Sequence, residues 1–249
     1  MSLRIAIITD LHLHLGDQES FGVDTQRNTL AVLQELAKRN PDHLLILGDI
    51  CLKQPEARMY AWTRDQLDKL GISYTLVAGN HDDVSMMAEE FGLALNGGEH
   101  YGRIDLGDYS LLYLDSSQKK ISATQLDWLA QQMQSSSAPV QYVLMHHPPV
   151  GMDVPYMDDE HSLQNKDEVM KVMHASKVPV VIFCGHYHVE KEARVGNIQI
   201  CITPSCYFQL DHFAKDFQID HYNIAYRILD FSEEIVRTSL HYLPGIKKE

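Results

Sequence analysis

The 249-residue sequence contains no apolar run long enough to cross a bilayer, since a transmembrane helix needs about 20 consecutive apolar residues. The apolar stretch within MSLRIAIITD is also too short for the apolar core of a signal peptide, and it is typical of a buried strand. These absences favour a cytoplasmic protein that has no membrane partner.

Positive charge is scarce: 21 Lys and Arg residues face 34 Asp and Glu residues, which gives a formal net charge of −13. Non-specific binding to nucleic acid or to an anionic membrane needs a cationic surface, so we expect neither partner. A small phosphate-bearing substrate is still compatible with this balance if groups other than Lys and Arg supply positive charge locally.

Cysteine is also sparse, and no pair has the CxxC spacing of a zinc site. We expect reduced, mostly buried thiols at Cys51, Cys184, Cys201 and Cys206. Internal repeats and low-complexity segments are missing. A hydrophobic content of 45% with 22% charged residues is ordinary for a globular protein of this length. We therefore predict one domain over residues 1–249.

Apolar strands alternate with amphipathic helices along much of the chain. The pattern predicts strands over 3–10, 43–49, 74–80, 141–147 and 178–186, and helices over 24–39, 55–70, 122–133 and 167–176. Asp24 is a plausible helix N-cap, and Ser122 with Gln125 has the spacing of a capping box. Gly107-Asp108 and Gly196-Asn197 predict hairpins, and two strands close the chain. The expected architecture is a layered α/β sandwich with mixed sheets.

Five of the predicted strands each end in a possible metal ligand. Ligand sites in α/β sheets form outside the carboxyl ends of the strands, so these five side chains should converge on one crevice. They are Asp10, Asp49, Asn80, His146 and His186.

Two of these strand ends carry a second polar residue two positions later, in Asp10-x-His12 and His186-x-His188. In an extended backbone, residues i and i+2 project to the same side, so both members of a pair could reach one ion. We therefore expect both segments to be extended, with Leu11 and Tyr187 pointing away.

The five motifs in their order resemble those of the calcineurin-like metallophosphoesterase superfamily. The motifs are DLH, GD at 48–49, GNHD at 79–82, HHPP at 146–149 and GHYH at 185–188. FGVDTQRNTLAVLQEL, HSLQNKDEVMKVM and TPSCYFQ are similar to the branch that contains class III cyclic nucleotide phosphodiesterases and glycerophosphodiesterases. The resemblance covers about residues 2–230 and implies a four-layer α/β/β/α sandwich of two mixed β-sheets flanked by helices.

The resemblance also implies a role for each motif residue. Asp10, His12, Asp49 and His188 would hold one divalent or transition metal ion. Asp49, Asn80, His146 and His186 would hold a second, with Asp49 bridging. His81 would lie beside the substrate phosphate with Asn80 and protonate the leaving group.

Such a residue set has a physical rationale. Two divalent ions about 3.5–4 Å apart generate a hydroxide nucleophile near neutral pH and clamp the displacement oxygens. Imidazole, amide and carboxylate ligands suit Mn, Fe, Zn or Co better than Ca or Mg. We therefore predict a dinuclear phosphodiesterase in which a metal-bridging hydroxide attacks a small phosphodiester, with a 3′,5′-cyclic nucleotide such as cAMP as the first candidate.

The residues leave several alternatives open. A glycerophosphodiester or a phosphomonoester could be the substrate, and a non-catalytic scaffold on the same fold is a remote alternative. The resembled branch often dimerises, so a homodimer is possible.

Some polar residues also have more than one interpretation. His14 is either a further ligand or a loop residue, and His147 either donates to a ligand or packs at a strand end. Asp82 either orients His81 or caps a helix near residue 85. Asn165 falls in a segment that resembles a substrate-side cap, and the acidic cluster MDDEH at 157–161 is more typical of a solvated loop than of a third metal site.

Overall fold

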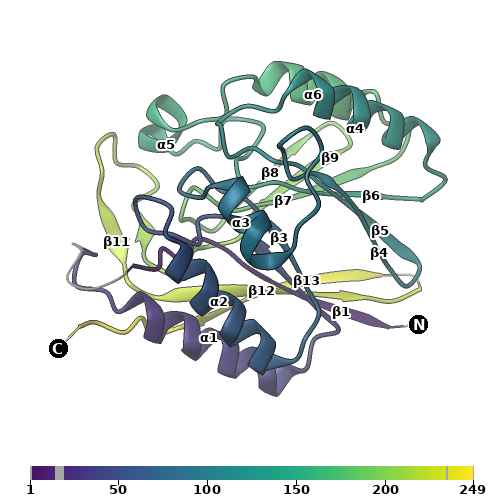
Figure 1. Ribbon diagram of the computed structural model, residues 1–249. Coiled ribbons are helices and arrows are strands. Elements are labelled where there is room, and N and C mark those ends of the chain that lie inside the picture. The colour runs from purple at the N-terminus through teal and green to yellow at the C-terminus, as the bar shows by residue number, and fades with distance from the viewer. Residues whose placement is uncertain (1, 15–19, 234, 249) are drawn as a thin grey trace.

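A five-stranded sheet forms one half of the computed structural model, which describes residues 2–14, 20–233 and 235–248 (Figure 1). Its spatial order is β13 (Val236–Leu243), β12 (Ile224–Phe231), β1 (Leu3–Ile8), β2 (His43–Leu47) and β3 (Tyr74–Val77). The last three strands run parallel, whereas β12 is antiparallel to both β1 and β13. The sheet is therefore mixed, as predicted.

A six-stranded sheet forms the other half. Its order is β4 (Gly102–Leu106), β5 (Tyr109–Tyr113), β6 (Gln141–Leu144), β7 (Val180–Cys184), β9 (Ile198–Ile202) and β8 (Lys191–Val195). The four inner strands are parallel, and the antiparallel edges β4 and β8 form the two predicted hairpins. A short pair, β10 (Gln209–Leu210) with β11 (Ile219–His221), stands apart from both sheets.

Helices cover the outer face of each sheet (Figure 1). The first sheet packs against α1 (Thr25–Arg39), α2 (Ala57–Leu70) and α3 (Val84–Phe91). The second packs against α4 (Ala123–Ser135) and α6 (Lys166–His174), and the short α5 (Pro155–Glu160) lies beyond its strand ends. Three separate apolar clusters fill the spaces between these layers. The predicted four-layer α/β/β/α sandwich is confirmed.

The two-faced burial of each strand explains its continuous apolar sequence. In β1, Ile5 and Ile7 face the cluster between the sheets, whereas Ala6 and Ile8 face the helices. Each of these side chains is 0% exposed. Strands covered on both faces do not alternate between polar and apolar residues, so a strand of this kind can end directly in a polar site.

The helix caps confirm most local predictions and correct two. Asp24 accepts a hydrogen bond from the Arg27 backbone N–H and starts α1 as expected. Ser122 caps α4, but the Gln125 side chain turns inward to Asp115 and Glu99 and does not complete a capping box. The second helix begins at Ala57 and not at Pro55.

Candidate metal centre

The five predicted ligand positions lie two or three residues beyond the ends of β1, β2, β3, β6 and β7. Backbone hydrogen bonds join the segments that follow these strands. The Asp10 N–H donates to the Gly48 carbonyl, and the His12 N–H donates to the Asp49 carbonyl, both at 3.0 Å. In the other sheet, the Gly185 N–H donates to the His146 carbonyl at 3.1 Å. The His186 N–H donates to Asp10 Oδ2 at 3.0 Å, so the strand ends of both sheets meet at one edge of the sandwich.

The backbone at the two ligand pairs is left-handed, and the expectation of an extended conformation was wrong. The φ angles are 54° at Asp10, 46° at His12, 69° at His186 and 52° at His188. Leu11 and Tyr187 are buried away from the site, as expected. Asp and His enter this region more readily than most side chains, but each such residue carries a conformational cost that its surroundings must offset.

Glycine is required beside the ligands because the motif loops approach one another closely. A Cβ on Gly48, whose φ is 95°, would lie 2.5 Å from the His146 Nδ1 and 2.8 Å from the Gly79 backbone. A Cβ on Gly79 would lie 2.4 Å from the Asp49 backbone nitrogen. These contacts are shorter than real Cβ atoms adopt, so the GD and GNHD motifs need glycine for packing as well as for chain conformation.

Each carboxylate has one oxygen held by the backbone and the other turned toward the imidazoles. The His186 N–H donates to Asp10 Oδ2 at 3.0 Å, and the His81 N–H donates to Asp49 Oδ1 at 2.9 Å. Asp10 Oδ1 lies 3.3 Å from His188 Nε2. Asp49 Oδ2 lies 3.3 Å from His146 Nε2 and 3.8 Å from His12 Nε2.

Among the described residues, three groups of side chains could each hold an ion, since their ligand atoms lie within 4.8 Å of one another. Asp49 occurs in two of the groups, which fits its predicted bridging position. The Asn80 side chain lines the same cavity as Asp49 and His186. The groups are Asp10, His12 and His188; Asp49, His146 and His186; and His12, Asp49 and His81.

Backbone carbonyls set the protonation of three of the imidazoles. His146 Nδ1 donates to the Leu47 carbonyl at 2.6 Å, His188 Nδ1 to that of Phe208 at 3.1 Å, and His186 Nε2 to that of His161 at 2.9 Å. A carbonyl only accepts, so in the neutral ring the other nitrogen carries a lone pair. This is the outer hydrogen bond that metal-binding histidines characteristically make.

The resulting donor atoms fit metal ions. His12 Nε2 and His188 Nε2 face each other at 2.9 Å. Within the described residues, the buried Asp10 Oδ1 and Asn80 Oδ1 have no hydrogen-bond partner. Lone pairs that converge from imidazole, carboxylate and amide groups repel unless a cation or a proton lies between them. The mixed N/O set suits a first-row transition metal.

The pKa values of the buried groups reflect the same crowding. Burial lowers the pKa of His12 and of His186 to about 3, so both rings are neutral and each has a lone pair available for a metal ion. Burial acts against ionisation of Asp10, but the charge and hydrogen bond of His188 outweigh it and lower its pKa to about 2. Burial likewise opposes a charge on His146, yet the Asp49 carboxylate raises its pKa to about 9. Without a cation, the His146–Asp49 pair therefore holds a proton near neutral pH.

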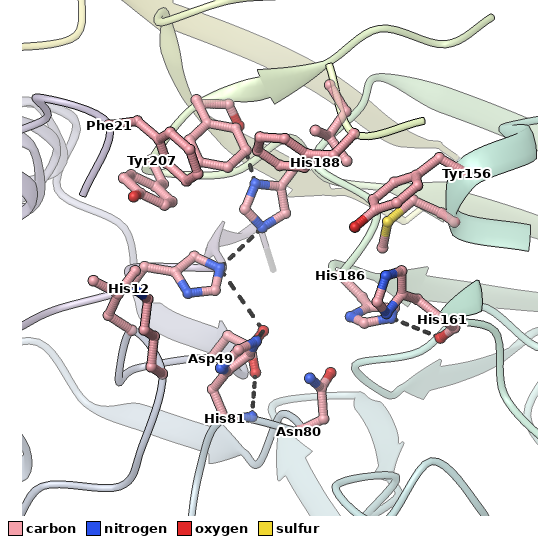
Figure 2. Close-up of a pocket in the computed structure, with 16 residues that line it drawn as sticks. His12, Phe21, Asp49, Asn80, His81, Tyr156, His161, His186, His188 and Tyr207 are labelled. Atoms are coloured by element: carbon pink, nitrogen blue, oxygen red, sulfur yellow. Dashed lines mark hydrogen bonds and ion pairs between the residues drawn. The ribbon is translucent and has the colours of Figure 1, made fainter. Parts of the chain in front are cut away.

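The predicted proton donor His81 lies beside these groups and is more accessible than they are. Its side chain is 33% exposed, and its Nε2 is 3.9 Å from Asp49 Oδ2. Its ring meets that of His12 edge-on at 5.2 Å. It lines a cavity of about 220 Å³ together with His12, Asp49, Asn80, His186 and His188 (Figure 2).

Asp82 neither contacts His81 nor caps a helix, contrary to both predicted roles. The helix cap is Asp83, which accepts from the Met86 N–H. The buried Asp82 carboxylate accepts hydrogen bonds from the backbone N–H groups of Ile50, Cys51 and Gly79 and from the Tyr60 hydroxyl. It thus joins the loop that carries Asp49 to the loop that carries Asn80, and burial raises its pKa to about 6.

The other residues with more than one predicted role have defined contacts in the structure. His147 is buried, its Nδ1 lies 2.9 Å from the Ser116 hydroxyl, and its ring packs 4.1 Å from that of His186. Asn165 bonds to the backbone of Ile121 through both its oxygen and its nitrogen. Within the described residues, His14 and His147 both stand outside the three groups. The packing of His147 agrees with the predicted interpretation of this residue as one that packs at a strand end.

The acidic cluster at 157–161 lies mainly in helix α5, so its interpretation as a loop was wrong. Asp158 accepts from the Met152 and Val154 N–H groups and, at 2.8 Å, from the Tyr187 hydroxyl. None of its acidic side chains joins a candidate metal group in the described part of the chain. The cluster therefore has a structural role beside the GHYH motif.

Sequence reasoning missed the aromatic wall of the cavity. It includes Phe21, Tyr156, Tyr207, Phe208 and Phe217, together with His161. These residues come from three loops and from helix α5 with its C-cap, which lie far apart in the sequence. The available signals were the segments that resemble the phosphodiesterase branch: TPSCYFQ contains Tyr207 and Phe208, FGVDTQRNTLAVLQEL begins at Phe21, and HSLQNKDEVMKVM begins at His161.

Comparison with known proteins points to one family. The family model for calcineurin-like phosphoesterases matches residues 3–190. A probable cyclic nucleotide phosphodiesterase of Fibrobacter succinogenes is 26% identical over 242 residues, which cover 96% of this chain and 94% of the relative. The 3′,5′-cyclic adenosine monophosphate phosphodiesterase CpdA of Escherichia coli strain K12 is 27% identical over 253 residues, with 97% and 90% coverage.

A solved structure supports the fold independently. The dimetal phosphatase of Danio rerio superposes with a TM-score of 0.74 at 11% identity and covers 98% of each chain. In the part of the chain that the structure describes, no helix has the length and apolar character needed to span a membrane.

Proposed function

The chain belongs to the calcineurin-like phosphoesterase family, and we propose that it is a dinuclear metal-dependent phosphodiesterase whose substrate is a 3′,5′-cyclic nucleotide such as cAMP. The convergence of imidazole and carboxylate lone pairs at one edge of the sandwich carries the proposal. The similarity to the cyclic nucleotide phosphodiesterases of Fibrobacter succinogenes (a probable one) and Escherichia coli supports the choice of substrate.

The proposal assigns the cavity floor to two metal ions. Asp10, His12 and His188 would hold one, and His146, His186 and Asn80 the other, with Asp49 shared. When bound, such ions lower the pKa of water and neutralise charge on a phosphoryl group. We propose that both ions are drawn from Mn, Fe, Zn and Co.

The chain's own residues would position the substrate and move the proton. Asn80 and His81 line the cavity beside Asp49, where a phosphoryl group would sit. His81 is half-buried at the edge of this group, so its ring can reach the departing alkoxide and act as the proton donor. The carbonyls behind His146, His186 and His188 keep these rings from rotating, so the site needs little rearrangement during the reaction.

The proposed partners follow from charge. Lys53 is the one Lys or Arg among the described residues that line the cavity, which favours a singly charged phosphodiester over a polyphosphate or a nucleic acid. A cytoplasmic location, a homodimer and the lack of a membrane partner stay predictions.

A turnover panel tests the proposal. Purified protein would be stripped with a chelator, reloaded with Mn²⁺, Fe²⁺, Zn²⁺ or Co²⁺, and assayed on cAMP, cGMP, glycerophosphocholine, bis(4-nitrophenyl) phosphate and 4-nitrophenyl phosphate. We expect the highest kcat/KM on a cyclic nucleotide, with about two metal ions per chain by elemental analysis.

Two other results would redirect the assignment. A preference for glycerophosphocholine or for the monoester would assign the protein to a glycerophosphodiesterase or a phosphomonoesterase. Failure to hydrolyse bis(4-nitrophenyl) phosphate with every metal would refute the enzymatic proposal and leave the scaffold alternative.

A further inference from the structure

Aromatic rings extend in a chain from the metal centre to the mouth of the cavity. The Phe208 ring lies 5.0 Å from that of His188. Phe21 and Phe217 contact Phe208 at 5.5 Å and 5.8 Å and each other at 5.1 Å. Tyr156 closes the chain at 5.9 Å from Phe217. We call Phe21, Tyr156, Phe208 and Phe217 the aromatic rim.

The aromatic rim is attached to the predicted metal ligands by hydrogen bonds. The Phe208 carbonyl accepts from His188 Nδ1, so the residue that carries this ring is bonded directly to the ligand. On the other side, the His161 carbonyl at the end of α5 accepts from His186 Nε2. A group that touches the rim is therefore held at a defined distance from the floor of the cavity.

Two of the rings are exposed although their surroundings are apolar. Phe21 is 44% exposed and Phe217 is 42% exposed, whereas Phe208 beneath them is 4% exposed. Phe21 also has a φ of 51°, which is unfavourable for a large side chain. Strain and apolar exposure that coincide at a cavity mouth are typical of a ligand contact.

The rings face a space of suitable shape. Figure 2 shows Phe21 and Tyr207 on one side of His188 and Tyr156 on the other, above Asp49, His81 and Asn80. The cavity of about 220 Å³ is smaller than the roughly 300–1,000 Å³ of sites for drug-sized ligands. It suits a small ester whose phosphate reaches the floor and whose other half contacts the rings.

We propose that the aromatic rim is a subsite for a flat aromatic group of the substrate, namely the base of a nucleoside phosphodiester. This inference rests on the proposed phosphodiesterase activity. Stacking on aromatic side chains binds any base through its π-face, and Tyr156, Phe21 and Phe217 offer such faces at the mouth. The floor would then select the phosphodiester, and the rim would select the aromatic group attached to it.

The first experiment compares two substrates that differ only in the base. They are cAMP and the same ribose 3′,5′-cyclic phosphate with hydrogen in place of adenine. We expect the wild-type protein to bind cAMP with a KM about 10- to 100-fold lower, since one stacked base is worth this much in affinity. Similar KM values for both compounds would overturn the inference and leave the phosphodiesterase proposal intact.

The second experiment changes the rim. Phe217→Ala and Phe21→Ala should each raise the KM for cAMP about 10-fold while changing the KM for the base-free compound less than about 2-fold. Phe217→Leu keeps an apolar side chain without a π-face, so it should resemble Phe217→Ala if stacking is responsible. A wild-type KM for cAMP in Phe217→Leu would show that any apolar side chain suffices at this position and would overturn the specific role of stacking.

A matched control lies in the same loop. Phe213 is 84% exposed and does not line the cavity. Phe213→Ala should leave both KM values unchanged. An equal effect of Phe213→Ala and Phe217→Ala on cAMP would indicate a general disturbance of the loop and would count against the subsite.

Calorimetry provides a readout that does not need turnover. AMP should bind to the metal-loaded wild-type protein about 10-fold or more tightly than ribose 5-phosphate, and Phe217→Ala should remove most of the difference. If no phosphodiester is hydrolysed but this difference persists, the proposed activity fails and the aromatic subsite stands. If AMP and ribose 5-phosphate bind equally, the subsite fails whatever the activity.

Discussion

The floor and the rim of the cavity are built in different ways. The floor consists of polar side chains that follow five strands, and its carboxylates and most of its imidazoles are buried. The rim consists of aromatic side chains from loops and from α5, and two of its rings are about two-fifths exposed. The floor is suited to holding charge in a fixed geometry, and the rim to contacting a ligand that the floor does not recognise. Reaction type and substrate choice are thus properties of separate parts of one site.

Loss of the shared carboxylate should have the largest effect because it removes the central group of the floor. We expect Asp49→Asn to weaken metal binding by more than the roughly 10- to 100-fold that loss of a residue behind a ligand produces. Hydrolysis of every substrate should fall with it. Elemental analysis and the turnover panel measure both effects, and the exposed turn variant Asp108→Asn is the control. Full metal content with full activity would contradict the assignment of the floor.

His81→Ala tests the boundary between floor and substrate. The backbone N–H that bonds to Asp49 is retained, so both metal ions should stay bound. Loss of a proton donor should slow cAMP hydrolysis about 100- to 10,000-fold. Substrates with a 4-nitrophenolate leaving group, which departs without a proton, should be affected much less. Equal loss on both kinds of substrate would refute the role of His81 as proton donor.

Tyr187→Phe tests the connection between floor and rim. The variant deletes the hydroxyl that donates to Asp158 at the base of α5. A hydrogen bond to a charged group contributes about 1.5–3 kcal/mol, so the free energy of unfolding should fall by a similar amount. Metal content should be unchanged, whereas the KM for cAMP should rise about 2- to 10-fold as Tyr156 moves. A fall in metal affinity without a change in the KM for cAMP would show that Tyr187 supports the floor only and would contradict its role in connecting floor and rim.

The pH dependence of the free energy of unfolding tests a group that affects the stability of the fold but does not belong to the floor. His43 starts β2, whose other end leads to Asp49, and it is not among the residues that line the cavity. Burial lowers its pKa to about 4. The unfolded state therefore binds the proton more tightly. The contribution of neutral His43 to the free energy of unfolding is complete above the unfolded pKa of about 6.5. It is lost as the pH drops toward 4, by roughly 3 kcal/mol at most.

His43→Gln should flatten this dependence in chelator-treated protein, as measured by urea unfolding at pH 7.5, 6 and 4.5. An unchanged pH dependence would show that other groups control acid stability. Activity at pH 7.5 should not change, which makes this the smallest expected effect on the site.

The sequence alone identified the floor because its signals are local. A buried strand that ends in Asp10, Asp49 or His146 is visible in a short window, and the family resemblance supplied the order of the motifs. The same local periodicity predicted the alternating strands and helices and the two hairpins. These features depend on residues near one another in the chain, so no knowledge of distant partners was needed.

Only the tertiary structure decided the backbone and the surroundings of that floor. The left-handed conformations at Asp10 and His188 are maintained by hydrogen bonds from other segments, so the extended geometry expected from local pattern was wrong. Asp82 was assigned to local contacts but serves two loops, and Phe21 and Phe217 meet across almost 200 residues of sequence. Spacing along the chain predicts which side chains follow a strand. Contacts between segments distant in the sequence determine how those side chains are held and what faces them across the cavity.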